Sequence, residues 1–364
     1  MAYILSIGTS LPDHEYSQEE IKSLVKSLFR NKIDRIDRFL KVFDHAQIEN
    51  RAFAVQKEWF DKNHSFDERN QLYHEVASQL AMKAIQSCFT NTEMLTKNIE
   101  ASSIDRIIFV SSTGISTPTI DAHVMNQHSF RMDIQRIPIW GLGCVGGASG
   151  LGLAHDLATA YQTENVLLVC VELCSLTFHP NDLRKSNLVG TALFSDGCSA
   201  VLVVGEKSKL RLHAKKELPY ISKRSSMTLK NSLNVMGWNI DKDGLQVVFS
   251  KDIPTIVRTF WKDHAHLFMK DINKTSKDFD FFVAHPGGKK VLEAFEDVLE
   301  SENGEFKYSY EVLRNHGNMS SPTVLFVLKK WMEDEKPAGS RALLSALGPG
   351  FTSELMDLEW REVQ

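Results

Sequence analysis

The sequence has few cysteines, no excess of positive charge and no long apolar lead. Its 364 residues include five cysteines, an odd number that argues against a disulfide framework and favours a reducing compartment. A formal net charge of −4 offers nucleic acid or an anionic membrane no general attraction. Residues 1–12 carry only a short apolar run without a basic lead, which predicts a first strand rather than a signal peptide or membrane span. We expect a cytoplasmic protein without stable membrane insertion or nucleic-acid binding.

Metal-ligand patterns are also scarce. Cys170 and Cys174 could suggest a metal pair, but no second Cys/His pair stands at the spacing of a zinc site. We therefore predict that both cysteines belong to a strand and a cavity wall, and that no metal is bound. The composition, 43% hydrophobic and 24% charged, is that of a globular protein whose length allows two half-size units sharing one core.

One pattern occurs twice along the chain. An apolar strand ends near Ser111, and a connection leads to Cys144, a helical segment and another apolar strand. A second strand ends at His285, and a connection leads to Asn318, another helical segment and another strand. Both connections span 33 residues. The repeat predicts two similar halves in which Cys144, His285 and Asn318 meet near a pseudo-twofold axis.

Cys144 lies in the glycine-rich segment GLGCVGGASGLG, at the point where an apolar run gives way to a helical pattern. The N-terminal end of a helix would favour a thiolate over a thiol, and glycine would let the backbone approach a substrate carbonyl. A nucleophile is one interpretation of this segment. A buried structural cysteine in a helix-packing seam is the other.

Together the three residues offer acyl-transfer chemistry. The imidazole of His285 can take the thiol proton of Cys144, while the amide of Asn318 can donate a hydrogen bond to an oxyanion. The trio fits peptide hydrolysis of the papain type or carbon–carbon bond formation on a thioester. The second reaction needs no carboxylate base when loss of CO₂ from a malonyl thioester supplies the carbanion. Each residue also has a structural reading, because His285 could end a strand and Asn318 could cap a helix.

Five segments carry a family resemblance. GLGCVGGASGLGLAHDLA surrounds Cys144, VAHPGG contains His285, NHGNMSSPTVLFVL contains Asn318, and LVGTALFSDGCSAVLV contains Phe194. The fifth, ALGPGFTSELMDLEW, lies near the C-terminus. From about residue 105 onward the chain resembles the chalcone synthase-like, or type III, polyketide synthases of the thiolase superfamily.

The resemblance implies a five-layered αβαβα thiolase fold of two pseudo-symmetric halves. Residues 1–210 would carry the nucleophilic cysteine, and residues 211–364 the histidine and asparagine. It also implies a homodimer that uses an acyl-CoA starter and malonyl-CoA without an acyl carrier protein or a cofactor. In the implied cycle Cys144 accepts the acyl group, His285 and Asn318 hold malonyl-CoA during decarboxylation, and the extended chain later cyclises.

The resemblance also marks substrate-binding positions. Phe194 would guard the cavity, and Val247 replaces a second gating phenylalanine of plant members, with Phe249 two residues on. Thr117 stands where plant members have a methionine that reaches across the dimer, and Trp238 opposes a simply wider cavity. The remaining candidates are wall, loop and CoA-contacting positions: Thr113, Cys174, Gly287, Gly288, Gly348, Pro349, Gly350 and Arg51. Ordinary core packing is the alternative for the cavity positions, and a solvated surface arginine is the alternative for Arg51.

The smaller side chains at 117 and 247 favour a long aliphatic starter over an aromatic one. In these features the chain is most similar to bacterial members that convert long-chain fatty acyl-CoA into alkylpyrones or alkylresorcinols. An initiating ketoacyl synthase with a single condensation is the nearest alternative. A papain-like hydrolase and a non-catalytic acyl-CoA binder also remain open.

Overall fold

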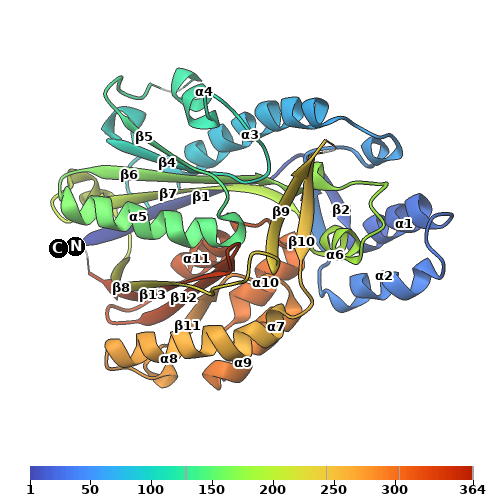
Figure 1. Ribbon diagram of the computed structural model, residues 1–364. Coiled ribbons are helices and arrows are strands. Elements are labelled where there is room, and N and C mark those ends of the chain that lie inside the picture. The colour runs from blue at the N-terminus through green and yellow to red at the C-terminus, as the bar shows by residue number, and fades with distance from the viewer. Residues whose placement is uncertain (128, 243, 303, 363–364) are drawn as a thin grey trace.

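The computed structural model describes residues 1–127, 129–242, 244–302 and 304–362. It is a layered α/β protein in which two sheets alternate with three layers of helices (Figure 1). Helices α3 and α4 cover one outer face, α5 and α11 lie between the sheets, and α8 and α9 cover the other outer face. The αβαβα order expected from the resemblance is therefore present.

The described strands and helices have the following bounds. The strands are β1 (Ala2–Ser10), β2 (His14–Ser17), β3 (Asn50–Phe53), β4 (Arg106–Val110), β5 (Gln135–Ile139), β6 (Asn165–Leu173), β7 (Asp196–Gly205), β8 (Leu218–Thr228), β9 (Met236–Asp241), β10 (Gly244–Phe249), β11 (Phe281–Ala284), β12 (Arg341–Gly348) and β13 (Thr352–Arg361). The α-helices are α1 (Gln18–Phe29), α2 (Ile36–His45), α3 (Phe66–Phe89), α4 (Ile120–Gln127), α5 (Gly146–Ala160), α6 (Lys185–Leu193), α7 (Ile253–Ile256), α8 (Lys262–Asp271), α9 (Lys289–Leu299), α10 (Lys307–His316) and α11 (Thr323–Glu333).

The two halves repeat one pairing pattern. In the first half β4 pairs parallel to β6, β6 antiparallel to β7, and β7 antiparallel to β1. In the second half β11 pairs parallel to β12, β12 antiparallel to β13, and β13 antiparallel to β8. The predicted repeat is therefore present in the strand order. The first half adds β5, parallel to β4, at its outer edge.

A single contact between β1 and β8 joins the two sheets, through the pair Tyr3 and Tyr220. The halves thus form one continuous nine-stranded arrangement with the order β11-β12-β13-β8-β1-β7-β6-β4-β5. The proposed boundary at residue 210 lies in the connection between β7 and β8.

The central helices explain why the middle of the molecule is apolar. β6 and β7 are buried along their whole length because helices cover both faces of their sheet. α11 buries eight of its eleven residues for the same reason. The ends of these central elements come together, so that residues far apart in the sequence share one interior region.

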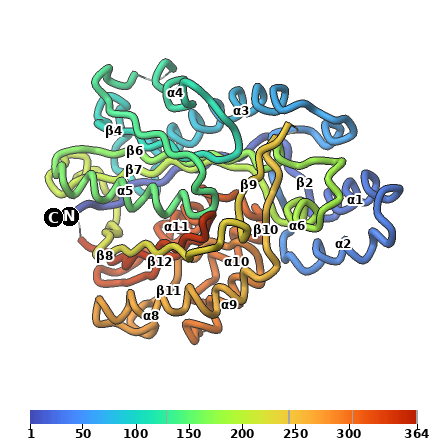
Figure 2. Tube along the Cα trace, viewed as in Figure 1, coloured from blue at the N-terminus to red at the C-terminus, as the bar shows by residue number. Residues whose placement is uncertain are grey.

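A smaller group of elements lies at one end of the molecule. The helices α1, α2 and α6 gather there beside the β9–β10 hairpin, as the chain trace shows (Figure 2). Strands β2 and β3 pair antiparallel within this group. It therefore forms a cap beside the region where the two halves meet.

Candidate active site

The fold brings the three predicted catalytic residues to one cavity. Cys144 lies in a short 3₁₀ helix, Gly143–Val145, that leads directly into α5. His285 follows β11, and Asn318 lies in the turn between α10 and α11. All three side chains are buried, and they line a cavity whose remaining walls are mostly apolar: Met236, Phe249, Ile253, Gly287, Val291, Phe295 and Leu347.

Asn318 presents its amide to the sulfur. Cys144 Sγ lies 3.9 Å from both Oδ1 and Nδ2 of Asn318. The backbone N–H of Ser320 donates to Asn318 Oδ1 at 2.8 Å, which fixes the oxygen end of the amide. The Nδ2 end therefore faces the cavity, with only a long 3.4 Å contact to the carbonyl oxygen of Gly287. This geometry leaves Asn318 as a hydrogen-bond donor for a developing oxyanion.

Burial keeps the two titratable groups uncharged in the empty cavity. It lowers the pKa of His285 to about 3, and neither ring nitrogen has a hydrogen-bond partner among the described residues. Burial also raises the pKa of the Cys144 thiol to about 11, while hydrogen bonds with Ser320 and Asn318 lower it in part. The sequence predicted a thiolate at a helix N-terminus. In the structure desolvation outweighs that effect and holds both the thiol and the imidazole neutral.

Two of the glycines around Cys144 are required by close approach. A Cβ atom at Gly147 would lie 2.1 Å from the carbonyl oxygen of Ser321, so only glycine lets α5 pass this close to the start of α11. Gly143 has φ +50°, and a Cβ there would lie 2.9 Å from Pro349. The glycine-rich segment around Cys144 is therefore also a place where two parts of the chain pack closely against each other.

The glycine-proline loop supports this segment from the other half. A Cβ at Gly348 would lie 2.6 Å from Val145 and from the carbonyl oxygen of Leu142. Gly350 has φ +100°, which lets the chain turn from β12 into β13. The loop residues thus hold the nucleophile turn in place.

A polar network behind the cavity was missed from the sequence. Glu172 is fully buried, and its carboxylate accepts hydrogen bonds from the Ser112 N–H at 2.9 Å and from Ser321 Oγ at 2.8 Å. Burial raises its pKa to about 7. Ser112 Oγ in turn accepts from the N–H groups of Gly141 and Gly143. The single charged residue in the apolar run NVLLVCVEL was the available signal.

Phe194 stands between this cavity and a second one. Its ring lies 6.1 Å from that of Phe249, which lines the catalytic cavity, and 6.4 Å from that of Trp238. Trp238 and Val247 face each other across the β9–β10 hairpin. The gating position predicted for Phe194 therefore has aromatic neighbours on the hairpin.

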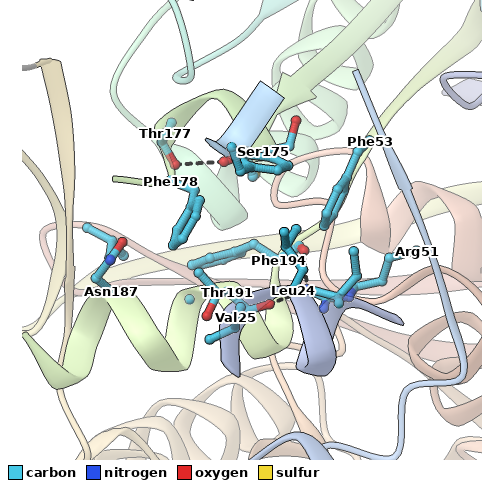
Figure 3. A pocket seen from close by; sticks show the side chains of 15 residues that line it. Leu24, Val25, Arg51, Phe53, Ser175, Thr177, Phe178, Asn187, Thr191 and Phe194 are labelled. Carbon is cyan, nitrogen blue, oxygen red and sulfur yellow. Dashed lines mark hydrogen bonds between the residues drawn. The ribbon is translucent and has the colours of Figure 1, made fainter. Parts of the chain in front are cut away.

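The second cavity extends from Phe194 beneath α6 toward α1 (Figure 3). The space in it that could hold a water-sized group is about 40 Å³, and the wider hollow, which includes open solvent, is about 480 Å³. Cys174 and Val247 lie in its wall together with Phe194. Most of the other lining side chains are apolar: Ile21, Leu24, Val25, Phe53, Phe60 and Phe178.

Three predicted residues have other placements. Thr113 is buried, and its hydroxyl accepts a hydrogen bond from the Leu173 N–H at 2.8 Å. Thr117 is exposed on the protomer surface. Gly288, with φ +153°, precedes α9 and packs near Leu193. None of these three residues lines either cavity.

Arg51 does not occupy the predicted entrance. Its relative exposure is 0%, so neither a CoA phosphate at the surface nor bulk solvent contacts it in this conformation. It lies instead in the wall of the second cavity. Its surroundings differ from the prediction because β3 pairs with β2 underneath α6 rather than forming an exposed loop.

Two other kinds of site are absent from the described residues. No group of three or more His, Cys, Asp or Glu side chains in that part of the chain could hold a metal ion. None of its helices combines the length and the apolar character needed to cross a membrane.

Comparison with known proteins gives matches over nearly the whole chain. Residues 1–207 match the N-terminal domain of chalcone and stilbene synthases, and residues 221–360 match their C-terminal domain. A putative chalcone synthase of Bacillus subtilis is 42% identical over all of both chains. A 1,3,6,8-tetrahydroxynaphthalene synthase of Streptomyces peucetius is 32% identical, covering 98% of this chain and 93% of that one.

A solved structure agrees with these matches. The 1,3,6,8-tetrahydroxynaphthalene synthase of Streptomyces coelicolor, described as a bacterial type III polyketide synthase, superposes with a TM-score of 0.88 over 99% of both chains at 26% identity. The thiolase fold predicted from the resemblance is thereby confirmed. The chain belongs to the chalcone and stilbene synthase family, the type III polyketide synthases.

Proposed function

We propose that this type III polyketide synthase loads a long-chain fatty acyl group from CoA onto Cys144, extends it with malonyl-CoA and cyclises the product to an alkylpyrone or alkylresorcinol. The observation that carries the proposal is the shared cavity of Cys144, His285 and Asn318. As a member of its family the protein is an acyltransferase, which excludes the papain-like hydrolase and the non-catalytic binder.

In the loading step the thiol of Cys144 and the imidazole of His285 both start uncharged. Cys144 Sγ attacks the thioester carbonyl while its proton passes to the imidazole of His285, whose ring nitrogens have no other hydrogen-bond partner among the described residues. The amide Nδ2 of Asn318 donates to the oxyanion of the tetrahedral intermediate. As the intermediate collapses, the carbon–sulfur bond to CoA breaks and the imidazolium returns the proton to the departing sulfur.

Extension uses the same donors. Malonyl-CoA loses CO₂, and the electron pair of the broken carbon–carbon bond becomes an enolate whose oxygen accepts hydrogen bonds from His285 and Asn318. The enolate carbon then attacks the acyl carbonyl on Cys144, and the cysteine sulfur leaves. The product is a β-ketoacyl-CoA two carbons longer, which can reload Cys144 for another round before cyclisation.

The second cavity supports an aliphatic starter. Its walls beyond Phe194 are mostly apolar, and Val247 leaves more room there than a phenylalanine would. Each methylene that such a wall removes from water contributes about 0.8 kcal/mol. An acyl chain that extends from Cys144 past Phe194 would therefore gain affinity with length until the cavity is full.

A homodimer is supported by an exposed edge. β5 pairs with β4 along one side, and the burial pattern of its residues is largely exposed. Ile115 and Trp140 nearby are large apolar side chains with relative exposures of 43% and 50%. Strand edges and exposed apolar groups of this kind are typical of subunit interfaces. In a dimer formed through this face, the exposed Thr117 would meet the partner chain, and sedimentation at micromolar protein would give twice the protomer mass.

The test of the proposed activity is a product assay by mass spectrometry. Purified protein is incubated with malonyl-CoA and a ladder of starters from acetyl-CoA to stearoyl-CoA, beside Cys144→Ala. Pyrones or resorcinols that form with long starters and are absent from the variant support the proposal. Products of a single condensation would support the initiating ketoacyl synthase instead, and products only from short starters would exclude the long-chain reading.

A further inference from the structure

A buried arginine forms part of the apolar second cavity. Arg51 on β3 extends its guanidinium inward beneath α6, among the side chains that line the cavity (Figure 3). Its relative exposure is 0%. A charged group that is removed this far from water needs partners for its charge and for its N–H groups.

The protein supplies only some of those partners. Nη1 of Arg51 donates to the backbone carbonyl oxygens of Thr191 at 2.5 Å and Phe194 at 3.0 Å. Nε and Nη2 have no hydrogen-bond partner among the residues that the structure describes. These two N–H groups form the side-on edge of a guanidinium, where they point in the same direction and match the two oxygens of a carboxylate.

The nearby carboxylate is already engaged elsewhere. Asp196 Oδ2 accepts from the Ala54 N–H and from Ser175 Oγ, and Oδ1 accepts from the Ser175 N–H. It therefore gives Arg51 a favourable field without filling the free edge of the guanidinium. The other close groups are aromatic rings, with Arg51 Cζ 5.3 Å from the ring centre of Phe53 and 5.9 Å from that of Phe43. Arg51 lies in the wall of an apolar cavity with two N–H groups unpaired among the described residues, and a ligand that is apolar along its length and anionic at its end would satisfy both.

We propose that the second cavity binds an acyl chain whose far end carries a carboxylate, which pairs with Nε and Nη2 of Arg51. The methylenes of the chain would pack against Leu24, Val25 and Phe178, and the thioester end would reach Cys144 past Phe194. This rests on the proposed function, because it assigns an ω-carboxyacyl-CoA as the starter that the synthase loads. The charge of Arg51 would make the cavity discriminate between acyl chains by their terminal group as well as by their length.

Binding can be tested without turnover in a Cys144→Ala background. Calorimetry would compare matched pairs of CoA thioesters with six to twelve acyl carbons, such as octanoyl-CoA and the mono-CoA thioester of suberic acid. We expect the ω-carboxy member to bind at least tenfold more tightly at the length that reaches Arg51. Arg51→Met, which keeps the length and removes the charge, should reverse that order.

Two controls separate a binding role from a structural one. Arg106 is another buried arginine; it begins β4 and pairs with Glu164. Arg106→Met should leave the ratio of the two affinities unchanged. If Arg51→Met does not fold, the comparison of matched ligands on the parent Cys144→Ala protein decides alone. Equal or tighter binding of the methyl-terminated member at every length overturns the proposal. The product assay does not depend on this result. The proposed synthase activity can therefore hold even if Arg51 does not bind a carboxylate.

Discussion

Phe194 and Asn318 are joined backbone to backbone as a parallel bridge. The Asn318 N–H donates to the carbonyl oxygen of Leu193, and the Ser195 N–H donates to the carbonyl oxygen of Asn318, each at 2.9 Å. Phe194, in the wall of the second cavity, and Asn318, the proposed oxyanion donor, are therefore fixed relative to each other. A shift of either backbone would be transmitted to the other.

Gly317 makes this bridge possible. Its φ is +66°, and a Cβ there would lie 3.0 Å from the carbonyl oxygen of Leu193 and 3.1 Å from the Arg51 stem. We expect Gly317→Ala to lower the free energy of unfolding by about 1–3 kcal/mol and to lower kcat by at least about tenfold through displacement of Asn318. Urea unfolding and the product assay would measure the two effects.

Gly339→Ala is the matched control for that variant. Gly339 also has a positive φ, +90°, but a Cβ there would have no atom within 4 Å. It should lose stability through backbone strain while keeping full turnover. Equal turnover by both variants would show that the Gly317 turn does not position Asn318.

Asn318→Asp should slow both chemical steps. The aspartate keeps the acceptor for the Ser320 N–H but replaces the Nδ2 donor by a second acceptor. We expect decarboxylation of malonyl-CoA to fall about 10²–10³-fold, the usual cost of one oxyanion donor. Release of labelled CO₂ reports decarboxylation, and the mass of the acylated protein reports loading. Acylation of Cys144 should fall as well, because the same Nδ2 donates to the oxyanion of the loading step, and an unchanged rate in either step would contradict that role for Asn318.

The sequence predicted the elements that carry the catalytic trio because each has a strong local signal. The apolar strands before Ser111 and His285 and the helices after Cys144 and Asn318 all form, as β4, β11, α5 and α11. β8 was not predicted, since ELPYISKRSSM mixes charge and proline in a strand that its neighbours β13 and β1 define. The network of Glu172 likewise depends on partners from two other elements, which local pattern cannot supply.

Arg51 shows the same limit at a single residue. The segment QIENRAFA reads as a polar stretch, and a charged residue is ordinarily exposed. Its burial follows from the packing of α6 over β3, which places backbone carbonyl oxygens where Nη1 can reach them. The position of an arginine relative to a cavity is therefore a tertiary property.

Val247→Phe should shorten the accepted starter. Val247 is buried in the wall of the second cavity, so a larger ring there would occupy space that the acyl chain needs. We expect the preferred starter to lose several carbons, because each excluded methylene gives up about 0.8 kcal/mol. The starter ladder measures this directly. Val248→Phe adds the same volume on the opposite face of β10 and should leave the length preference unchanged, and an equal shift in both variants would argue against this cavity as the acyl site.

His264 should make stability fall in mild acid. Its Nδ1 lies 2.8 Å from Ser353 Oγ and its Nε2 3.0 Å from Ser225 Oγ, and burial lowers its pKa to about 4. Below about pH 6.5 the unfolded chain takes up a proton that the folded protein refuses. The contribution of His264 to stability is therefore complete above pH 6.5 and is lost as the pH falls toward 4, by up to about 3 kcal/mol.

His264→Asn removes this titration and keeps an amide that can reach Ser353. The variant should be less stable than the parent at pH 7, and the difference between their free energies of unfolding should shrink by about 2 kcal/mol between pH 6.5 and pH 4.5. Urea unfolding at a series of pH values measures the difference. His266→Asn, a change at an exposed position on the same helix, should run parallel to the parent across this range. A constant gap for His264→Asn would mean that the folded protein accepts the proton, and that burial does not hold this imidazole neutral.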